Sequence, residues 1–160
     1  MAHGDLPVPA AERSLVLCFA SPVARELADL APRLGWRVAL LDPDPARTPR
    51  SAAARVADLA LDDGTDVVVC DHDRPELGDV LVDVLARPTR WVGVMGSLRH
   101  TAPHVAALRE RGVPDDDIAR VHRPIGLDVG ARSPAEIAVA TLAGLLADRN
   151  GRPGGLFRPS

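Results

Sequence analysis

Short apolar runs alternate along this chain with segments of helical periodicity, and this alternation constrains the fold more than any other feature. Each apolar run of about five residues is followed by a stretch in which apolar residues recur every three or four positions. Strands separated by helices in this way are typical of βαβ units, which build a parallel sheet. The runs expected to form buried strands are residues 14–18, 37–41, 66–70 and 90–94.

Helix start and stop signals lie between these runs. Ser21 is placed as an N-cap, Pro22 stands at the first helical position, and the first helix is expected to end at Gly35. Ser133 and Glu136 have the spacing of a capping box, which explains Glu136 as a structural residue. Beyond the first helix, an amphipathic stretch is expected over 49–60 and helices over 76–86, 97–111 and 133–148.

These elements predict a single α/β domain over residues 14–148. We expect a Rossmann-like, doubly wound, mostly parallel sheet with helices on both faces. Residues 1–13, with two prolines, are expected to form a flexible leader, and residues 149–160, rich in Gly and Pro, a flexible tail.

Composition argues against two classes of partner. The net charge is −3, and the 19 cationic residues, all arginine, are spread along the chain without a cluster, so nucleic acid is not an expected ligand. No apolar run approaches the length of a membrane span, so no membrane role is expected. The first residues lack the order of a signal peptide, so a cytoplasmic location is expected.

Neither the cysteines nor the histidines predict a metal site. Cys18 and Cys70 end apolar runs and are interpreted as small buried hydrophobic residues, since their separation fits no zinc motif. His100 and His104 lie one helical turn apart without a carboxylate or cysteine at ligand spacing, so they are interpreted as a solvated helix face.

Polar and glycine residues follow the predicted strands, at the edge where this class of fold binds its ligands. The candidate ligand-binding residues at this edge are Ala20, Ser21, Asp42, His72, Asp73, Gly93, Gly96, Ser97 and Arg99, together with Gly126, Asp128 and Gly130 of the following loop.

The turn after the first strand, residues 19–24 (FASPVA), has the shape of the phosphate-binding turn G-x-G-x-x-A with Phe19 and Ser21 at the glycine positions. Side chains there block a pyrophosphate from the backbone, and Pro22 removes one N–H donor, so NAD(P) is not expected in its usual pose. Ser21 is still expected to cap the helix and to contact an oxyanion. Asp42 follows Phe19 by 23 positions, the place of a ribose-binding acid, or it is an ordinary turn residue.

Two further motifs offer polar groups at the same edge. The second glycine turn, with Gly93, Gly96 and Ser97, is expected to open a helix whose amino end binds an anion with the help of Arg99, the alternative being a tight turn with a serine cap. The His72-Asp73 pair, residues 72–73, is either a general base with its orienting carboxylate or a loop pair in which the aspartate caps the next helix, and we assign no catalytic residue.

Three segments together resemble the C-terminal Rossmann-like domain of the XdhC/CoxI family, the xanthine dehydrogenase accessory proteins. They are HD at 72–73, WVGVMGSLR at 91–99 and RPIGLDVGARSPAEIAVATLAGLLA at 123–147. The sequence departs from the family pattern at the first turn, at Leu98, where the family has arginine, and at Gly144, where it has glutamate. The family also carries a separate N-terminal domain with a cysteine motif, whereas this sequence begins close to its first expected strand.

The resemblance implies a role in the maturation of a molybdenum hydroxylase, similar to xanthine dehydrogenase or CO dehydrogenase. Members of the family bind the molybdenum cofactor, protect it while its sulfido ligand is installed, and deliver it to the apoenzyme. Such a carrier is an accessory protein rather than an enzyme, and its expected partners are the apoenzyme, a separate protein with the N-terminal type of domain, or a second copy of the chain. Two alternatives remain: an NAD(P)-binding oxidoreductase, and a degenerate module that acts through protein partners alone.

Overall fold

The computed structural model describes residues 13–48, 50–97, 99 and 102–157. These residues form a sheet of five strands in the order β2-β1-β3-β4-β5, and every neighbouring pair is parallel. The strands are β1 (Arg13–Cys18), β2 (Trp36–Leu41), β3 (Thr65–Val69), β4 (Trp91–Val94) and β5 (Val121–His122). The expected leader lies outside the described residues except for Arg13, which opens β1.

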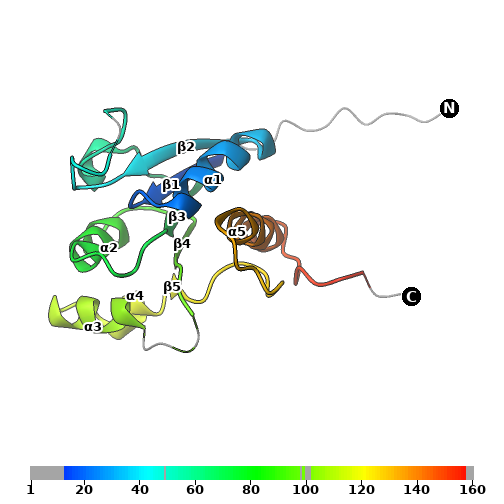
Figure 1. The fold of residues 1–160 in the computed structure, drawn as a ribbon. Coiled ribbons are helices and arrows are strands. Elements are labelled where there is room, and N and C mark those ends of the chain that lie inside the picture. The colour runs from blue at the N-terminus through cyan, green and yellow to red at the C-terminus, as the bar shows by residue number, and fades with distance from the viewer. Residues whose placement is uncertain (1–12, 49, 98, 100–101, 158–160) are drawn as a thin grey trace.

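Helices cover both faces of the sheet, as Figure 1 shows. On one face α1 contacts α5, and on the other α2 contacts α3. The helices are α1 (Pro22–Leu30), α2 (Leu77–Leu85), α3 (Pro103–Glu110), α4 (Asp115–Ile118) and α5 (Pro134–Arg149), with short 3₁₀ turns η1 (Ala31–Leu34) and η2 (Val56–Asp58). This arrangement confirms the predicted Rossmann-like α/β class.

The two faces of the sheet bury separate apolar clusters, because successive residues of a strand point to opposite sides. Leu15 and Leu17 of β1 pack with Leu142 of α5, whereas Val16 packs with Leu81 of α2. All five residues of β3 are buried, as expected for a central strand with helices above and below. Among the described residues, no helix is long and apolar enough to cross a membrane.

Local capping signals set the starts of two helices as predicted, whereas the first helix, expected to end at Gly35, ends at Leu30 and is followed by η1. The Ser21 side chain accepts a hydrogen bond from the Ala24 N–H at 3.1 Å at the start of α1. Ser133 and Glu136 form the predicted capping box of α5, in which each side chain accepts from the other residue's backbone N–H.

Two predicted boundaries are wrong on the β5 side of the sheet. The helix expected from residue 97 begins instead at Pro103, because the backbone of Ala102 is extended, as is favoured before a proline. Residues 121–122, expected in a loop, form β5 and pair with Val92 and Gly93 of β4. A run of two residues is too short for a periodicity signal, and only its pairing with β4 defines it as a strand.

A buried carboxylate ties α5 to the amino end of the sheet. Asp66 of β3 is fully buried, and it accepts hydrogen bonds from Trp36 Nε1 (3.1 Å), Arg90 Nε (2.5 Å) and Arg149 Nε (2.8 Å). Arg149 also donates to the Gly64 carbonyl at 2.6 Å. The last residue of α5 is therefore fixed to the sheet by charged hydrogen bonds, although the sequence placed it in a flexible tail.

Candidate functional site

The strand order reverses between β1 and β3, and this reversal defines a topological switch point. The chain passes from β1 to β2 on one side and from β3 through β4 to β5 on the other. Ligands of doubly wound folds bind outside the carboxyl ends of the strands at such a point. In this chain the segments that leave it are 19–21 after β1 and 70–74 after β3.

Phe19 occupies the first glycine position of the turn after β1 in the conformation that glycine ordinarily takes. Its φ is +73°, in the left-handed region, and its side chain is fully buried. The guanidinium carbon of Arg74 stacks over the Phe19 ring at 4.7 Å from its centroid. The Phe19 ring thus packs into the core on the α2 face of the sheet. The group that lies at the switch point is the Arg74 guanidinium, which covers the Phe19 ring.

Asp42, the predicted ribose-binding acid, is engaged inside the protein. Arg74 donates to both of its carboxylate oxygens, at 2.7 and 3.0 Å, and the N–H groups of Ala20 and Asp44 donate at 2.9 Å each. Both partners of the ion pair are buried. Burial opposes ionisation of the Asp42 carboxyl, but hydrogen bonds from Arg74, Ala20 and Asp44 outweigh it and lower the pKa. A ribose hydroxyl could bind here only if Arg74 moved away.

A cavity of about 610 Å³ opens beside this turn, on the α1 side of β1 and β2. Its walls are mostly apolar, formed by Leu17, Leu40 and small residues of α1. Three polar groups stand around it: Ser21 at the start of α1, Arg25 one turn later, and Arg47 after β2. Both arginines are exposed at the surface, and Arg47 forms an ion pair with Asp44 (Nε to Oδ2, 3.2 Å). We call this the α1 cavity.

The predicted residues Ala20 and Ser21 line the α1 cavity, but the other predicted residues do not. His72 and Asp73 follow β3 in the neighbouring loop, where His72 Nε2 lies 3.5 Å from Asp73 Oδ1. The cap residue of α2 is Glu76, and the Asp73 N–H donates to Asp71, so the alternative in which Asp73 caps α2 is wrong.

The second glycine turn is packed against protein side chains. A Cβ on Gly93 would lie 2.2 Å from the Trp91 ring, and one on Gly96 would lie 2.4 Å from Arg123 Nε. Ser97 opens no helix; its hydroxyl accepts from the Arg99 N–H at 3.1 Å, and Arg99 itself is exposed. The prediction that Ser97 opens the helix is therefore wrong, because α3 starts further along, at Pro103, and Arg123 is the cation packed against this turn.

The PIGLDVG loop approaches α5 closely at one point. Gly126 has φ +86°, and a Cβ there would lie 3.1 Å from the backbone of Ala140, whose carbonyl accepts from the Leu127 N–H at 3.0 Å. Gly144 faces the same contact, since its Cβ would lie 3.0 Å from the Cα of Gly126. The small residue at 144 thus allows the loop to rest on the helix, where the family's glutamate would not fit without a shift.

Gly126→Ala should therefore cost more stability than Gly130→Ala in the same loop. Both positions have positive φ, but nothing lies within 4 Å of a Cβ at Gly130. At Gly126 we expect the free energy of unfolding to fall by roughly 1–3 kcal/mol, because backbone strain adds to the contact against α5. At Gly130 we expect a smaller loss, because only the backbone strain remains. Urea unfolding of both variants measures the difference, and equal losses would contradict the close approach.

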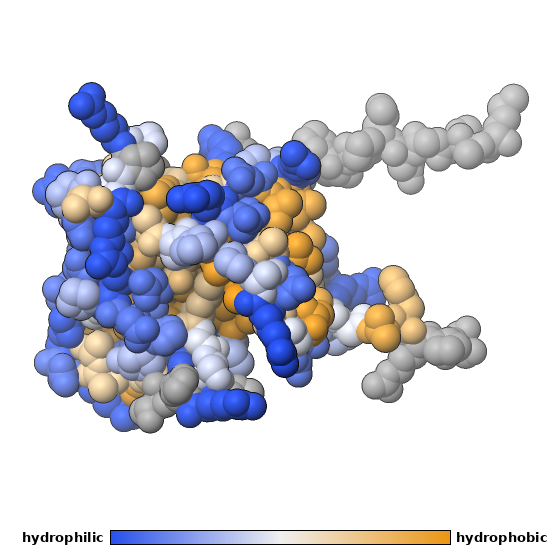
Figure 2. Space-filling model, viewed as in Figure 1, coloured by the Kyte–Doolittle hydropathy of each residue, from blue (hydrophilic) through white to orange (hydrophobic). Residues whose placement is uncertain are grey.

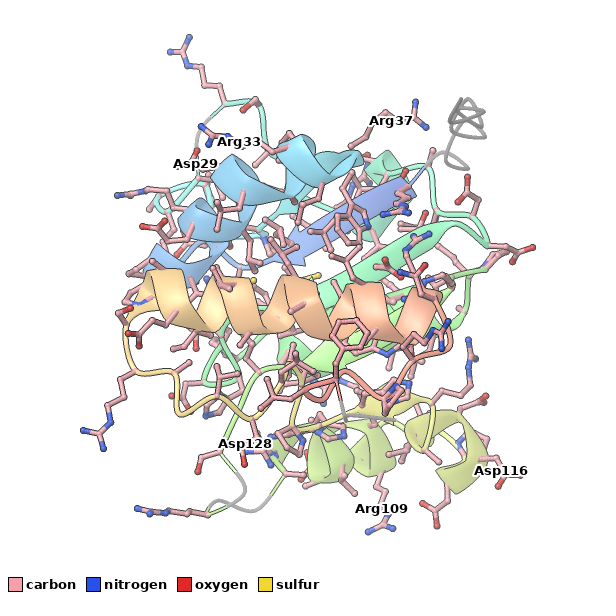
Figure 3. All side chains as sticks on the ribbon, turned by 90° about the vertical axis from the view of Figure 1, so that its right-hand side faces the viewer. Asp29, Arg33, Arg37, Arg109, Asp116 and Asp128 are labelled. Carbon is pink, nitrogen blue, oxygen red and sulfur yellow. The ribbon has the colours of Figure 1, made fainter. Side chains whose placement is uncertain are left out.

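Asp128 is exposed on this loop and points away from the body of the protein, near the amino end of α5 in Figure 3. Gly126, Asp128 and Gly130 do not line the α1 cavity. The structure thus divides the predicted residues between the α1 cavity, the buried ion pair after β2, the loop after β3, the turn after β4 and the loop before α5.

Two expectations about titratable side chains have different outcomes. Cys18 and Cys70 are buried, as predicted; burial, with a smaller effect from Asp42, raises the pKa of the Cys18 thiol to about 12, and burial also raises that of Cys70. His104 is buried on α3, so its interpretation as solvated is wrong, while His100 lies outside the described residues. The described residues hold no group of three or more His, Cys, Asp or Glu placed to bind a metal.

Sequence reasoning missed Arg25, Arg47, Arg74 and Arg123. Arg74 pairs with a residue 32 positions away, so no local spacing rule identifies it. Arg123 directly follows β5 and would have been placed at the carboxyl edge had that short strand been recognised. Arg25 lies one helical turn after the Ser21 cap, and this cap was the local sequence signal that could have identified it.

The parallel sheet, its switch point and its two helical layers define a Rossmann-like α/β domain. Residues 15–145 match the family described as the XdhC Rossmann domain, and the chain belongs to this family. It is 35% identical over 162 aligned residues to the uncharacterized protein YqeB of Escherichia coli K12, an alignment that covers 91% of this chain and 29% of that protein.

A solved structure shares the fold. A crystal structure described as a xanthine dehydrogenase (BH1974) from Bacillus halodurans superposes with a TM-score of 0.70 at 22% identity, over 88% of this chain and 45% of that one. The chain thus spans less than a third of the length of YqeB and less than half of the solved chain.

Proposed function

We propose that this chain serves as the Rossmann domain of an accessory factor for a molybdenum hydroxylase, and that the α1 cavity binds the molybdenum cofactor during insertion into the apoenzyme. Membership of the XdhC family is the observation that carries the proposal. The solved relative described as a xanthine dehydrogenase agrees with this assignment in name. The further expected partners are a separate protein with the N-terminal type of domain and a second copy of the chain.

The residues around the α1 cavity fit such a ligand. Its volume of about 610 Å³ falls within the range of roughly 300–1,000 Å³ for small-molecule sites. A pterin is flat and can lie on the apolar wall of Leu17 and Leu40, while Arg25 and Arg47 stand near enough to the cavity to bind its phosphate. The cofactor supplies the molybdenum centre together with its own dithiolene ligands, so the domain needs no metal-binding side chains.

The same geometry disfavours the NAD(P) alternative. A dinucleotide fold binds pyrophosphate at a glycine turn and ribose at an acid after the second strand. Here Phe19 stands at the first glycine, the Ser21 hydroxyl is used as a helix cap, and both oxygens of Asp42 are engaged by Arg74. The proposal therefore gives the domain the role of a carrier that binds and protects the cofactor, and it assigns no catalytic residue.

A binding titration separates these functions. The purified chain is titrated with molybdenum cofactor released under anaerobic conditions from a donor enzyme, and with NADH and NADPH in parallel. The proposal expects saturable binding of the cofactor alone. Binding of NADH or NADPH instead would support the oxidoreductase, and no binding of any of the three would favour a module that acts through protein partners.

The double substitution Arg25→Ala/Arg47→Ala should weaken cofactor binding by roughly 100-fold or more, since each charged hydrogen bond contributes about 1.5–3 kcal/mol. Stability should change little, because both side chains are exposed. Arg33→Ala is the matched control, since Arg33 is an exposed arginine of η1, as Figure 3 shows. Equal affinities in the double variant and the control would place the cofactor elsewhere.

A further inference from the structure

A second cavity, of about 370 Å³, lies on the opposite face of the sheet, between α3, α4, β5 and the turn after β4. Most of its walls are apolar, including Val105 of α3 and Ile118 of α4, both of which pack with the α2-side core. Its polar groups are Ser97, His104 and Arg123. We call it the α3 cavity.

His104 brings a buried, unsatisfied polar atom to the wall of this cavity. The residue is 4% exposed, and among the described residues its Nδ1 has no hydrogen-bond partner. Leaving a buried imidazole nitrogen unpaired costs about 1–3 kcal/mol, so such an atom calls for a partner that binds in the cavity. Burial lowers the pKa of His104, and the nearby Arg123 lowers it further, so both favour the neutral form of the ring.

Arg123 places a positive charge beside this histidine. Its Nη2 donates to the Ser97 carbonyl at 3.1 Å, and its guanidinium packs against Gly96, where a Cβ would lie 2.4 Å from Arg123 Nε. The amino end of α3 lies at the same cavity, and Ala102 provides no side-chain cap for it. The cavity therefore combines a guanidinium, a neutral imidazole and the positive end of a helix dipole.

These groups together favour a phosphate over a carboxylate. An arginine fork fully engages the two oxygens of a carboxylate, whereas a phosphate has further oxygens for a second contact. A neutral imidazole pairs with a phosphate in either tautomer, as a donor to P–O⁻ or as an acceptor from P–OH. The apolar walls leave room for an organic substituent.

We propose that the α3 cavity is a binding site for a small organic phosphate monoester, with Arg123 and His104 as its two phosphate contacts. The site is separate from the α1 cavity, because the sheet lies between them and they flank opposite ends of the strand order β2-β1-β3-β4-β5. A phosphate site in the α3 cavity goes beyond the proposed function, and its test does not depend on the molybdenum cofactor.

The test uses phenyl phosphate, inorganic phosphate and benzoate as probes of the full chain. Isothermal titration should give phenyl phosphate the highest affinity, inorganic phosphate a lower one and benzoate the lowest. Arg123→Gln should weaken phenyl phosphate binding roughly 10- to 100-fold, and His104→Leu roughly 3- to 10-fold. Arg120→Gln and His122→Gln change exposed residues that lie outside the cavity wall. In these variants the affinity for phenyl phosphate should stay within about twofold of the wild-type value.

A second readout keeps the test decisive if the Arg123 or His104 variants fail to fold. In the wild-type chain labelled with ¹⁵N, phenyl phosphate should shift the Nδ1 resonance of His104 and leave that of His72 in place. Similar affinity for benzoate, an unmoved His104 resonance at saturation, or equal loss in the control variants would each overturn the proposal. Equal affinities for phenyl phosphate and inorganic phosphate would overturn the proposal that the ligand is a monoester with an organic group, and would assign the cavity to free phosphate.

Discussion

The substitution Arg74→Met should lower the free energy of unfolding of this domain by about 3–5 kcal/mol, the usual loss when one partner of a buried ion pair is removed. Methionine preserves much of the packing on Phe19 but leaves the buried Asp42 carboxylate with only its two backbone donors. Equilibrium unfolding in urea measures the loss, and the turn after β1 should loosen, because Ala20 binds the same carboxylate.

An exposed ion pair provides the matched control. Arg55 and Asp58 are joined at 3.0 Å, with side chains 74% and 41% exposed, so Arg55→Met should change stability by less than about 1 kcal/mol. The double variant Asp42→Asn/Arg74→Met completes a double-mutant cycle, and a large coupling energy is expected. A loss of under 1 kcal/mol for Arg74→Met would show that the pair does not fix the switch point.

The sign of the pH dependence follows from the same pair. The folded-state pKa of Asp42 is lower than the ordinary value of 3.8, so its contribution to stability is present above that value. The contribution is lost as the pH falls below 3.8 and through the folded-state pKa. Arg74→Met should therefore reduce the acid sensitivity of unfolding in this range.

The second large effect is expected at the amino end of the sheet, where Asp66→Asn should cost about 3–5 kcal/mol. The amide is nearly isosteric but neutral, and it cannot accept all three hydrogen bonds from Trp36, Arg90 and Arg149. Because Arg149 ends α5, hydrogen exchange in the last turn of that helix should accelerate more than in its first turn. Urea unfolding and hydrogen exchange measure the two effects.

Asp79→Asn is the control for this substitution. Asp79 accepts from Arg111 Nε at 2.7 Å, but its side chain is 76% exposed, so the change should be within about 1 kcal/mol. Uniform acceleration of exchange along α5, or a loss at Asp66 no larger than at Asp79, would contradict the view that Asp66 anchors the end of this helix.

The sequence predicted the sheet better than it predicted where apolar side chains reach the surface. In Figure 2, apolar side chains gather where α1 and α5 lie, whereas the side of α2 and α3 is more hydrophilic. Val139 of α5 is 57% exposed. The sequence of α5 is apolar around most of its circumference, so periodicity alone does not say which side faces the sheet.

Of the residues predicted at the carboxyl edge of the sheet, the structure places two at the α1 cavity, and the arginines beside that cavity were not predicted. Ser21 and Ala20 were assigned to the edge from the fold class alone, and both line the α1 cavity. The cations were not found, because arginines are scattered along this chain and the sequence does not say which of them meet. Asp42 was recognised by spacing, but its engagement by Arg74 depends on a contact across 32 positions.

The sequence by itself determined the first four strands, the α1 and α5 caps, the doubly wound class and the family, because each depends on residues a few positions apart or on a continuous motif. Only the tertiary structure decided that Asp42 meets Arg74, that Asp66 gathers Trp36 and two arginines, and that His104 lies buried beside Arg123. These contacts join residues from separate elements, whose distances are fixed only when the sheet has formed. Burial then decides their chemistry, since a charge or an imidazole nitrogen taken out of water must find a partner.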